Sequence, residues 1–418
     1  MKWAAATAAV GAAVCLFCAG IPIARAADAP AVQAASAVLI DADTGVVLLD
    51  KSMHERRPIA STTKVMTALL ALEHGKLSDW VTVSPSVLSL ERGSNVGLQP
   101  SDVAAMDDLL KSLLLASGND AAVAIAEHLG GSVQRFAGMM NARAAELGAA
   151  DTHFVNPHGL YDPNHYSSAY DLGLITAAAF AHPRFAELVA SKVVEVSLPS
   201  APEGVVQLIN HNRLLWRADF VDGVKTGFVK ESGHCLIASG SKKGWRLIAV
   251  VLDSPDMYAD AKALLDYGFT TFQRQVYARA GDAVGRSAVR SGTHSSVPAV
   301  AERTLACVTG PGLTDAGCRL VVKVEKLTAP VAKGARVGEA RLVSGPRTLA
   351  ASPLVASEEV RRSWLKIIGT WLFWLVVIAA LFVFSVRTGA KIVKARRFRR
   401  RLLAAQGGGT DSVGPRQG

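Results

Sequence analysis

Apolar and polar residues follow two different periods along this chain. The segments "SAVLIDADTGVVLLD" and "GHCLIASGSKKGWRLIAVVLD" each contain two strand-like apolar runs around a short turn, which predicts a hairpin at each place. Between them, apolar residues recur at helical spacing in "DLLKSLLLAS", "DAAVAIAEHLG" and "VQRFAGMMNARAAELG". Strands at both ends with helices between predict an α+β domain over residues 36–272, whose terminal segments lie side by side in one sheet.

A change in composition after this region predicts a second domain. Residues 275–355 consist of short Val-, Ala- and Arg-rich runs broken by Gly, Pro and Ser, which indicates a small β-rich domain. Cys307 and Cys318 flank a Pro-Gly sequence there, and their pairing stays open because the sequence does not give their separation in space. Cys235 lies in a strand pattern, and we expect it to be a buried, small apolar side chain.

Two terminal segments predict how the chain relates to a membrane. Residues 1–26 combine an early lysine, an apolar run and small residues before a cleavage point, the layout of a secretory signal peptide. Residues 367–386 are a twenty-residue apolar stretch without a charge, long enough to cross a hydrocarbon core of about 30 Å. The basic segment 387–418 predicts a cytoplasmic tail. We therefore expect a single-pass protein of the inner (plasma) membrane, with residues 27–366 on the periplasmic, extracytoplasmic side.

The net charge of +10 is a consequence of this topology. Residues 1–26 carry +2 and residues 387–418 carry +8, so the chain between them is neutral as a whole. A nucleic-acid-binding surface requires basic residues in the folded domains. We therefore expect no nucleic-acid partner.

A serine followed three residues later by a lysine occurs three times, at Ser61, Ser239 and Ser363. The spacing alone carries little weight, because about one or two such pairs are expected by chance at average residue usage. Ser363 lies at the edge of the predicted membrane span, and Ser239 lies where a strand runs into a solvated turn. Neither of these two has a plausible pocket around it.

Ser61 differs because an apolar helix is predicted to begin on it. Pro58 precedes it, and Gly75 ends the helical pattern. Free backbone N–H groups at a helix N-terminus favour an oxyanion beside the serine, and the one-turn spacing places Lys64 on the same face. A lysine activates a serine only if burial or neighbouring cations lower its pKa, so further groups must surround this helix.

The sequence supplies further groups in a definite order. Ser117-Gly118-Asn119 follows an apolar helical run, and Lys225-Thr226-Gly227 lies on a predicted strand before the last hairpin. Together with Ser61 and Lys64, this series resembles the signature of the penicillin-recognising serine acyl-enzymes. The chain looks like a low-molecular-mass penicillin-binding protein of the D-alanyl-D-alanine carboxypeptidase family. The likeness spans residues 36–272 and includes "NPHGLYDPNHYSSAYDL" and "GVKTGF".

The resemblance implies a fold and a set of catalytic roles. The fold is a helical cluster packed on a five-stranded antiparallel sheet, followed by a β-rich domain and a C-terminal membrane attachment. Ser61 is the expected nucleophile and Lys64 its general base. Ser117 is expected to relay protons to the leaving amine, while Asn119 holds Lys64 or the peptide backbone of the substrate.

The same resemblance implies the substrate-binding residues. Lys225 and Thr226 are expected to receive the terminal carboxylate of the peptide or of penicillin. Gly227 keeps the strand clear so that the substrate lies alongside it. The backbone N–H groups of Ser61 and Phe228 are the expected oxyanion hole.

Two features depart from the wider superfamily. The middle motif is Ser-Gly-Asn rather than the Ser-Asp-Asn of class A β-lactamases, which favours the carboxypeptidase branch. Some family members place an arginine before the Lys-Thr-Gly motif to bind the substrate carboxylate, whereas this chain offers His211 and Arg213 in "NHNRLLW". The sequence leaves open which of these two takes that part.

The sequence bears on four alternative functions. A β-lactamase of class A needs a glutamate with an asparagine four residues on, and no Glu between Asn119 and Lys225 has one. An endopeptidase on the same fold stays open, as does an inactive, membrane-anchored cell-wall scaffold, although the intact motifs argue against the scaffold. A metal site built from His153, His158, Asp162 and His165 lacks the compact helical spacing of zinc peptidases.

The expected function is therefore a membrane-tethered serine carboxypeptidase. It removes the terminal D-alanine from peptidoglycan stem pentapeptides, and β-lactam antibiotics acylate it. No metal or organic cofactor is expected.

Overall fold

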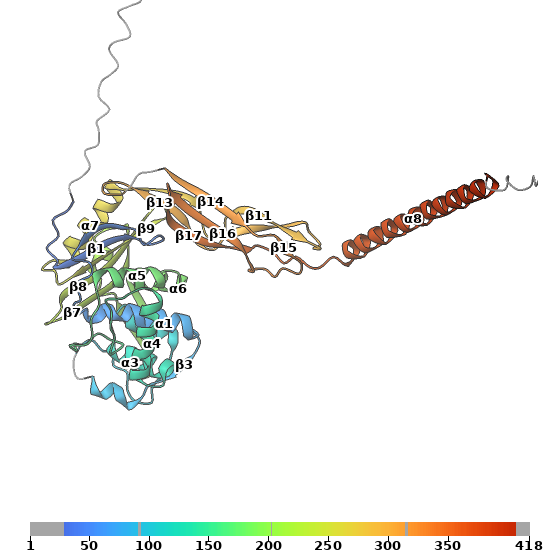
Figure 1. Ribbon diagram of the computed structural model, residues 1–418. Coiled ribbons are helices and arrows are strands. Elements are labelled where there is room, and N and C mark those ends of the chain that lie inside the picture. The colour runs from blue at the N-terminus through green and yellow to red at the C-terminus, as the bar shows by residue number, and fades with distance from the viewer. Residues whose placement is uncertain (1–28, 91–92, 202, 314–316, 407–418) are drawn as a thin grey trace, which may run out of the picture. The chain divides into compact units, whose positions relative to one another are not determined.

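The computed structural model describes residues 29–406, apart from 91–92, 202 and 314–316. The predicted signal peptide and the last twelve residues of the predicted tail lie outside the described residues. Two compact units make up the chain (Figure 1). The first runs to Ala278 and includes residues 304–320 and 342–350, and the second comprises Arg279–Arg303, Val321–Arg341 and the chain from Ala351 onward.

A five-stranded antiparallel sheet forms the centre of the first unit. Its strand order is β2-β1-β9-β8-β7, with the bounds β1 (Ser36–Asp41), β2 (Val47–Lys51), β7 (Val221–Val229), β8 (Gly233–Lys242) and β9 (Trp245–Leu252). β1 pairs with β9 from Ser36 opposite Leu252 to Asp41 opposite Leu247. The prediction that the terminal segments lie side by side is therefore confirmed, as is the five-stranded sheet.

Both faces of this sheet are covered, because alternate residues of the strands point to opposite sides. Val38 and Ile40 of β1 belong to the core under the helical cluster, while Leu39 belongs to a second core beneath α7 (Met257–Thr271). At Gly268 of α7, an added Cβ would lie 2.4 Å from a Leu247 methyl carbon. Only glycine allows this helix to lie so close to the sheet.

The helical cluster carries the nucleophile and the groups around it. Its elements are the 3₁₀ turn η1 (Ala60–Thr63) and the helices α1 (Lys64–His74), α2 (Met106–Leu114), α3 (Asn119–Gly130), α4 (Val133–Glu146), α5 (Ala169–Ala179) and α6 (Pro183–Ala190). Two hairpins, β3 (Trp80–Thr82) with β4 (Val103–Ala105) and β5 (Val193–Ser197) with β6 (Val205–Ile209), and two 3₁₀ turns, η2 (Pro85–Ser89) and η3 (Arg213–Trp216), complete the unit.

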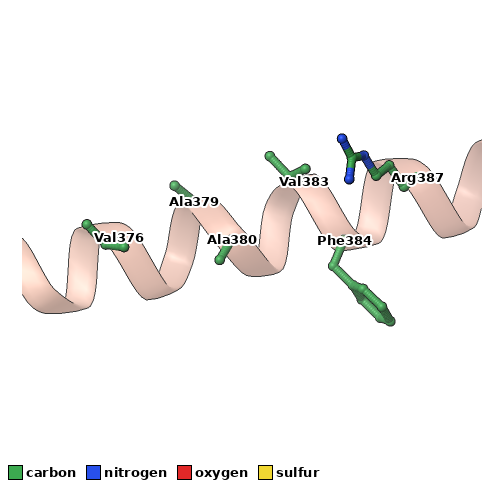
Figure 2. A pocket seen from close by; sticks show the side chains of 6 residues that line it. All are labelled: Val376, Ala379, Ala380, Val383, Phe384 and Arg387. Atoms are coloured by element: carbon green, nitrogen blue, oxygen red, sulfur yellow. The ribbon is translucent and has the colours of Figure 1, made fainter.

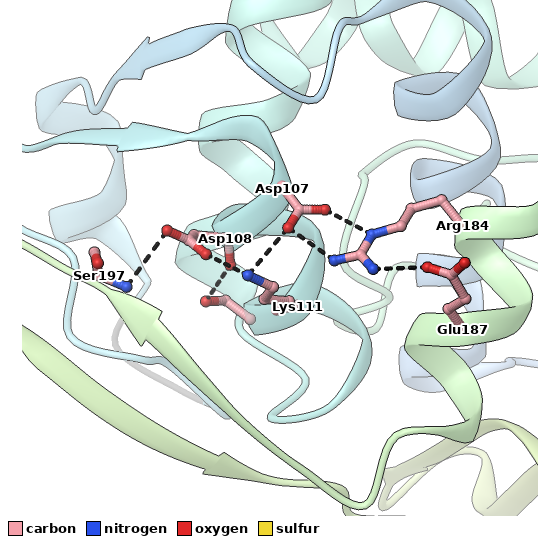
Figure 3. A network of polar contacts seen from close by, with 7 residues as sticks. Asp107, Asp108, Lys111, Arg184, Glu187 and Ser197 are labelled. Atoms are coloured by element: carbon pink, nitrogen blue, oxygen red, sulfur yellow. Dashed lines mark hydrogen bonds and ion pairs between the residues drawn. The ribbon is translucent and has the colours of Figure 1, made fainter.

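An ion-pair network joins α6 to α2. Arg184 donates from Nε and from a terminal nitrogen to the two carboxylate oxygens of Asp107, both at 2.8 Å (Figure 3). Lys111 bonds both Asp107, at 3.0 Å, and Asp108, at 2.7 Å. A planar guanidinium gripping a carboxylate at two points fixes orientation as well as distance, so α6 is held in one position on α2.

The rest of the folded chain is β-rich, as predicted. β10 (Gln273–Ala278) pairs with β13 (Leu305–Thr309), and a six-stranded sheet has the order β14-β16-β17-β12-β11-β15. Its strands are β11 (Ala283–Arg290), β12 (Ser296–Ala301), β14 (Cys318–Val324), β15 (Leu327–Thr328), β16 (Arg336–Ser344) and β17 (Arg347–Ala356). Cys307 and Cys318 form a disulfide, while Cys235 is a free, fully buried thiol, as expected.

The chain continues into one long helix, α8 (Trp364–Gln406). It is the one helix in the described residues that is long and apolar enough to cross a membrane. Val376, Ala379, Val383 and Phe384 project from successive turns of this helix, and Arg387 follows one turn after Val383 (Figure 2). The predicted C-terminal apolar helix is therefore present.

Removal of the disulfide by the double substitution Cys307→Ala and Cys318→Ala is expected to destabilise the protein. The bridge closes a loop with a sequence separation of 11, and such a loop restrains the unfolded chain by about 2–3 kcal/mol. Denaturant unfolding of the full chain in detergent measures the loss against the oxidised wild type. Equal free energies of unfolding would contradict a stabilising bridge.

Candidate active site

Ser61 lies in η1, one turn before α1 begins at Lys64. The sequence predicted that the helix begins on Ser61 itself. In the structure, a short 3₁₀ turn that contains Ser61 precedes the helix. The Lys64 side chain is fully buried. Its Nζ lies 2.8 Å from Ser61 Oγ, 2.7 Å from Asn119 Oδ1 and 2.7 Å from the His158 carbonyl oxygen. The first motif and the asparagine of the second are thus brought together.

These contacts suit a lysine that acts as a base. Burial lowers the pKa of Lys64 well below its usual value of 10.5, the positive charge of Lys225 lowers it further, and Asp120 partly opposes the shift. A neutral amine donates two hydrogen bonds and accepts one. In that form, donation to Asn119 and to the His158 carbonyl oxygen would leave the lone pair of Nζ to accept the Ser61 hydroxyl proton.

Ser117 lies in the connection between α2 and α3, two residues before Asn119. It is buried, and its φ of +63° lies in the left-handed region that serine rarely occupies. Such strain persists only where the surrounding structure imposes it. Asp120, buried beside Asn119, supplies part of that structure by accepting the backbone N–H groups of Val96, Gly97 and Leu98 at 2.9–3.1 Å.

The Lys-Thr-Gly motif lies on β7, which is the edge strand next to η1. A Cβ added to Gly227 would be 3.0 Å from the backbone nitrogen of Ser61 and 3.1 Å from the Ile59 carbonyl oxygen. The third motif therefore contacts the first so closely that a Cβ at Gly227 would crowd the backbone around Ser61. Phe228 follows with its side chain 61% exposed and its ring 4.5 Å from that of His234.

Lys225 is buried, and its Nζ donates to the Thr226 carbonyl oxygen at 3.0 Å. Burial lowers the pKa of Lys225 to about 7. Two buried lysines thus lie in one site, and an anion that enters would stabilise the charged form of each. This is the electrostatic character expected of a carboxylate-binding cleft.

His211 and Arg213, the two candidates for a carboxylate partner, differ in position. The backbone N–H of His211 bonds the Leu115 carbonyl oxygen at 3.1 Å, which ties it to the segment before Ser117. Desolvation by the surrounding protein lowers the pKa of His211, and the charges of Lys225 and Lys64 lower it further. Both residues are exposed, and Arg213 begins η3. We therefore favour His211 for this part.

The loop containing the four candidate metal ligands supports the nucleophile instead. His165 accepts the backbone N–H of Val155 at Nδ1, at 3.2 Å, and its Nε2 lies 2.8 Å from Thr63 Oγ1. Thr63 in turn donates to the Ala60 carbonyl oxygen at 2.8 Å. Burial lowers the pKa of His165 to about 4, so the ring is neutral and donates from Nε2. In the part of the chain that the structure describes, no three His, Cys, Asp or Glu residues gather as a metal site.

Ala60, next to the nucleophile, has a φ of +47°. Gly159 of the same loop has a φ of +88°, and a Cβ there would lie 1.8 Å from the Ala60 carbonyl oxygen. Sequence reasoning named neither Thr63, His165 nor Gly159 as supports of Ser61. The signal available was the dense Asn-Pro-His-Gly sequence, but only the fold shows that it packs against η1.

These contacts bring together a serine, a buried lysine, a second lysine and a strand edge, the groups expected of a serine acyl-transfer site. Comparison with known proteins agrees with this class. Residues 23–256 match the family model of the D-alanyl-D-alanine carboxypeptidases, and residues 272–362 match that of the penicillin-binding protein 5 C-terminal domain. The chain belongs to the D-alanyl-D-alanine carboxypeptidase family.

Individual relatives cover most of the chain. D-alanyl-D-alanine carboxypeptidase DacF of Bacillus subtilis is 34% identical over 341 residues, which span 79% of this chain and 87% of the relative. DacD of Escherichia coli is 32% identical over 79% of this chain and 88% of its own length. The crystal structure of penicillin binding protein 5 from Haemophilus influenzae, 30% identical, aligns with a TM-score of 0.60 over 80% of this chain and 99% of that one.

Substitution of Gly159 by alanine is expected to slow acylation of Ser61 by a fluorescent penicillin about 100-fold, the cost of misplacing a catalytic group by about an ångström. The added Cβ would collide with the Ala60 carbonyl and displace the adjacent serine. Stopped-flow labelling of the full chain measures the rate. Gly148→Ala is the matched control, because Gly148 also has a positive φ, +78°, but open space around it. Equal rates in both variants would show that the contact does not position Ser61.

The buried Lys225 predicts a pH dependence of stability. Its pKa is about 7 in the folded protein and near 10.5 in the unfolded chain. Between these pH values the unfolded chain therefore binds a proton that the folded protein does not. Protonation of the chain therefore favours the unfolded state over this range. The free energy of unfolding falls as the pH falls from 10.5 to about 7. From pH 7 to 9, wild type should gain up to about 2 kcal/mol relative to Lys225→Met.

Denaturant unfolding of the full chain in detergent at both pH values tests this prediction. Lys230→Met is the control, since Lys230 is exposed and the same pH change should affect wild type and this variant equally. A Lys225→Met variant that follows the wild-type pH dependence would mean that Lys225 titrates normally in the folded protein.

Proposed function

We propose that this chain is a serine-type D-alanyl-D-alanine carboxypeptidase that removes the terminal D-alanine from peptidoglycan stem pentapeptides. The observation that carries the proposal is the position of Lys64 Nζ, buried and within 2.8 Å of both Ser61 Oγ and Asn119 Oδ1, beside a strand edge. The family membership gives the reaction class, and this geometry supports the role proposed for each residue. Residues 36–272 form the proposed catalytic domain, and residues 275–355 form the proposed β-rich domain.

Acylation begins when Ser61 Oγ attacks the carbonyl carbon of the penultimate D-alanine. Lys64 Nζ takes the hydroxyl proton as the O–C bond forms, and the backbone N–H groups of Ser61 and Phe228 stabilise the oxyanion. Each such donor contributes on the order of 3 kcal/mol in acyl-transfer enzymes. The C–N bond then breaks, and the proton passes from Lys64 through Ser117 to the leaving nitrogen. Free D-alanine departs, and an ester on Ser61 remains.

Deacylation reverses the roles with water as the nucleophile. Lys64, neutral again, takes a proton from the water as its oxygen attacks the ester carbonyl. The oxyanion collapses, the bond to Ser61 Oγ breaks, and the proton returns to that oxygen. The products are a stem peptide one residue shorter and the regenerated serine.

The terminal carboxylate of the substrate is the group that selects an exopeptidase reaction. Lys225 and Thr226 lie on the strand beside Ser61, and His211 lies within the field of both lysines. A bound carboxylate raises the pKa of Lys225, so binding and protonation support each other. A β-lactam carries a carboxylate and a strained amide in a similar relation, so we propose that penicillin acylates Ser61 as well.

Membrane attachment follows from α8. The apolar stretch beginning at Ile367 is long enough to span a bilayer, and the basic residues from Arg387 onward favour the cytoplasmic side. This proposal places the catalytic domain on the extracytoplasmic side of the plasma membrane, where stem peptides are exposed. Simple anchoring of the enzyme to the inner membrane accounts for the topology.

The proposal is tested by D-alanine release from a peptide ending in Lys-D-Ala-D-Ala. Ser61→Ala is expected to lower the rate at least about 1,000-fold, because the nucleophile of a covalent mechanism is removed. Ser363→Ala is the matched control, since Ser363 belongs to a second Ser-x-x-Lys sequence and should retain full activity. Release that persists in Ser61→Ala, or no release from wild type, would contradict the proposed function.

A further inference from the structure

The turn between β11 and β12 is bonded to the first residues of α8. Ser363 donates its backbone N–H to the Ser291 carbonyl oxygen at 2.8 Å, and Lys366 Nζ donates to the Gly292 carbonyl oxygen at 2.8 Å. A Cβ at Gly292 would lie 2.7 Å from a methyl carbon of Val360. The turn and the start of the helix are therefore one connected structure, with no free linker between them.

A third segment joins the same structure. Val331 and Val360 exchange backbone hydrogen bonds of 2.9 and 2.8 Å, and Thr293 donates its backbone N–H to the Arg361 carbonyl oxygen at 2.8 Å. Residues 290–295, 329–334 and 357–366 together are called the membrane-proximal base below. Because its parts hold one another by backbone bonds, the side chains on it keep fixed relative positions.

The helix fixes the depth of this base. The uncharged stretch begins at Ile367, and Ser363 precedes it by four residues, which is about 6 Å along a helix. The headgroup layer on each side of the hydrocarbon core is roughly 5–8 Å thick. When α8 crosses the bilayer, the base therefore lies within the headgroup layer.

The exposed charges of the base are mostly positive. Five exposed cations outnumber the two exposed carboxylates, those of Glu358 and Glu359. The cations are Arg290, Lys333, Arg361, Arg362 and Lys366. The ion pair between Arg361 and Glu359, 3.3 Å long, is largely exposed on both sides and neutralises little of the charge in water. The Arg362 guanidinium lies 5.0 Å from the centre of the Trp364 ring, a residue type that favours the interface.

We propose that the membrane-proximal base is a docking surface for the phosphate headgroups of anionic phospholipids. The proposal rests on the membrane anchoring described above. Guanidinium groups bind phosphate oxygens at two points, and each basic residue near an anionic surface adds to the attraction. The base thus holds the β-rich unit against the bilayer surface as well as joining it to the helix.

Energy transfer in lipid nanodiscs tests this proposal with the full chain. A donor dye on Thr293→Cys lies on the exposed turn, and the free thiol within the described residues, Cys235, is fully buried. Transfer is compared between discs with a trace of acceptor-labelled phosphatidylglycerol and discs with acceptor-labelled phosphatidylcholine. The expected result is local enrichment of phosphatidylglycerol on the order of five-fold, which falls as salt screens the charges.

Two triple variants make the comparison specific. Arg290→Gln/Arg361→Gln/Arg362→Gln should abolish the preference, whereas Arg279→Gln/Arg303→Gln/Arg341→Gln, exposed arginines elsewhere in the same unit, should keep it. Both should release D-alanine in detergent at the wild-type rate, which verifies folding. Equal transfer from the two lipids in the wild type would overturn the lipid preference while leaving the anchoring intact. Transfer from neither lipid would overturn the anchoring itself.

Discussion

The burial of Lys64 is the constraint on which the rest of the site depends. Three uncharged acceptors surround its Nζ: a hydroxyl, an amide oxygen and a backbone carbonyl. Burial away from water disfavours the ammonium form of Lys64, and Lys225 adds positive charge nearby. The protein gives up stability here, since an apolar side chain would fill the same space at lower cost. What it gains is a lysine of lowered pKa beside Ser61, the proposed nucleophile.

The same constraint explains why so much of the surrounding backbone is strained or tightly packed. Ala60 and Ser117 have positive φ values on either side of Lys64, and Gly159 and Gly227 occupy positions that a Cβ would block. Strain of this kind survives only where neighbouring contacts enforce it. Here the enforcing contacts come from a histidine-containing loop, the α2–α3 connection and the edge strand, so the site is held from three sides.

The sequence predicted much of this arrangement and missed a definite part of it. The hairpins, the helical cluster and the terminal strand pairing followed from hydrophobic periodicity, because burial on one face or two dictates that pattern. The three motifs were found by their order and their resemblance to a family. The support of Ser61 by Thr63 and His165 was not predicted, since a hydrogen bond between residues about a hundred positions apart leaves no local pattern. For the same reason the sequence offered His165 only as one of four possible metal ligands, an interpretation that it did not favour.

By itself, then, the sequence determined the chemistry that is available: a serine and a lysine one helical turn apart, a second lysine on a strand, an apolar segment fit to cross a membrane and a β-rich domain before it. Only the tertiary structure decided what those groups do to one another. The lowered pKa of Lys64 and the bonds that tie the β11–β12 turn to α8 both depend on distances between residues remote in the chain. Desolvation and Coulomb interactions depend on distances in space, and folding determines those distances.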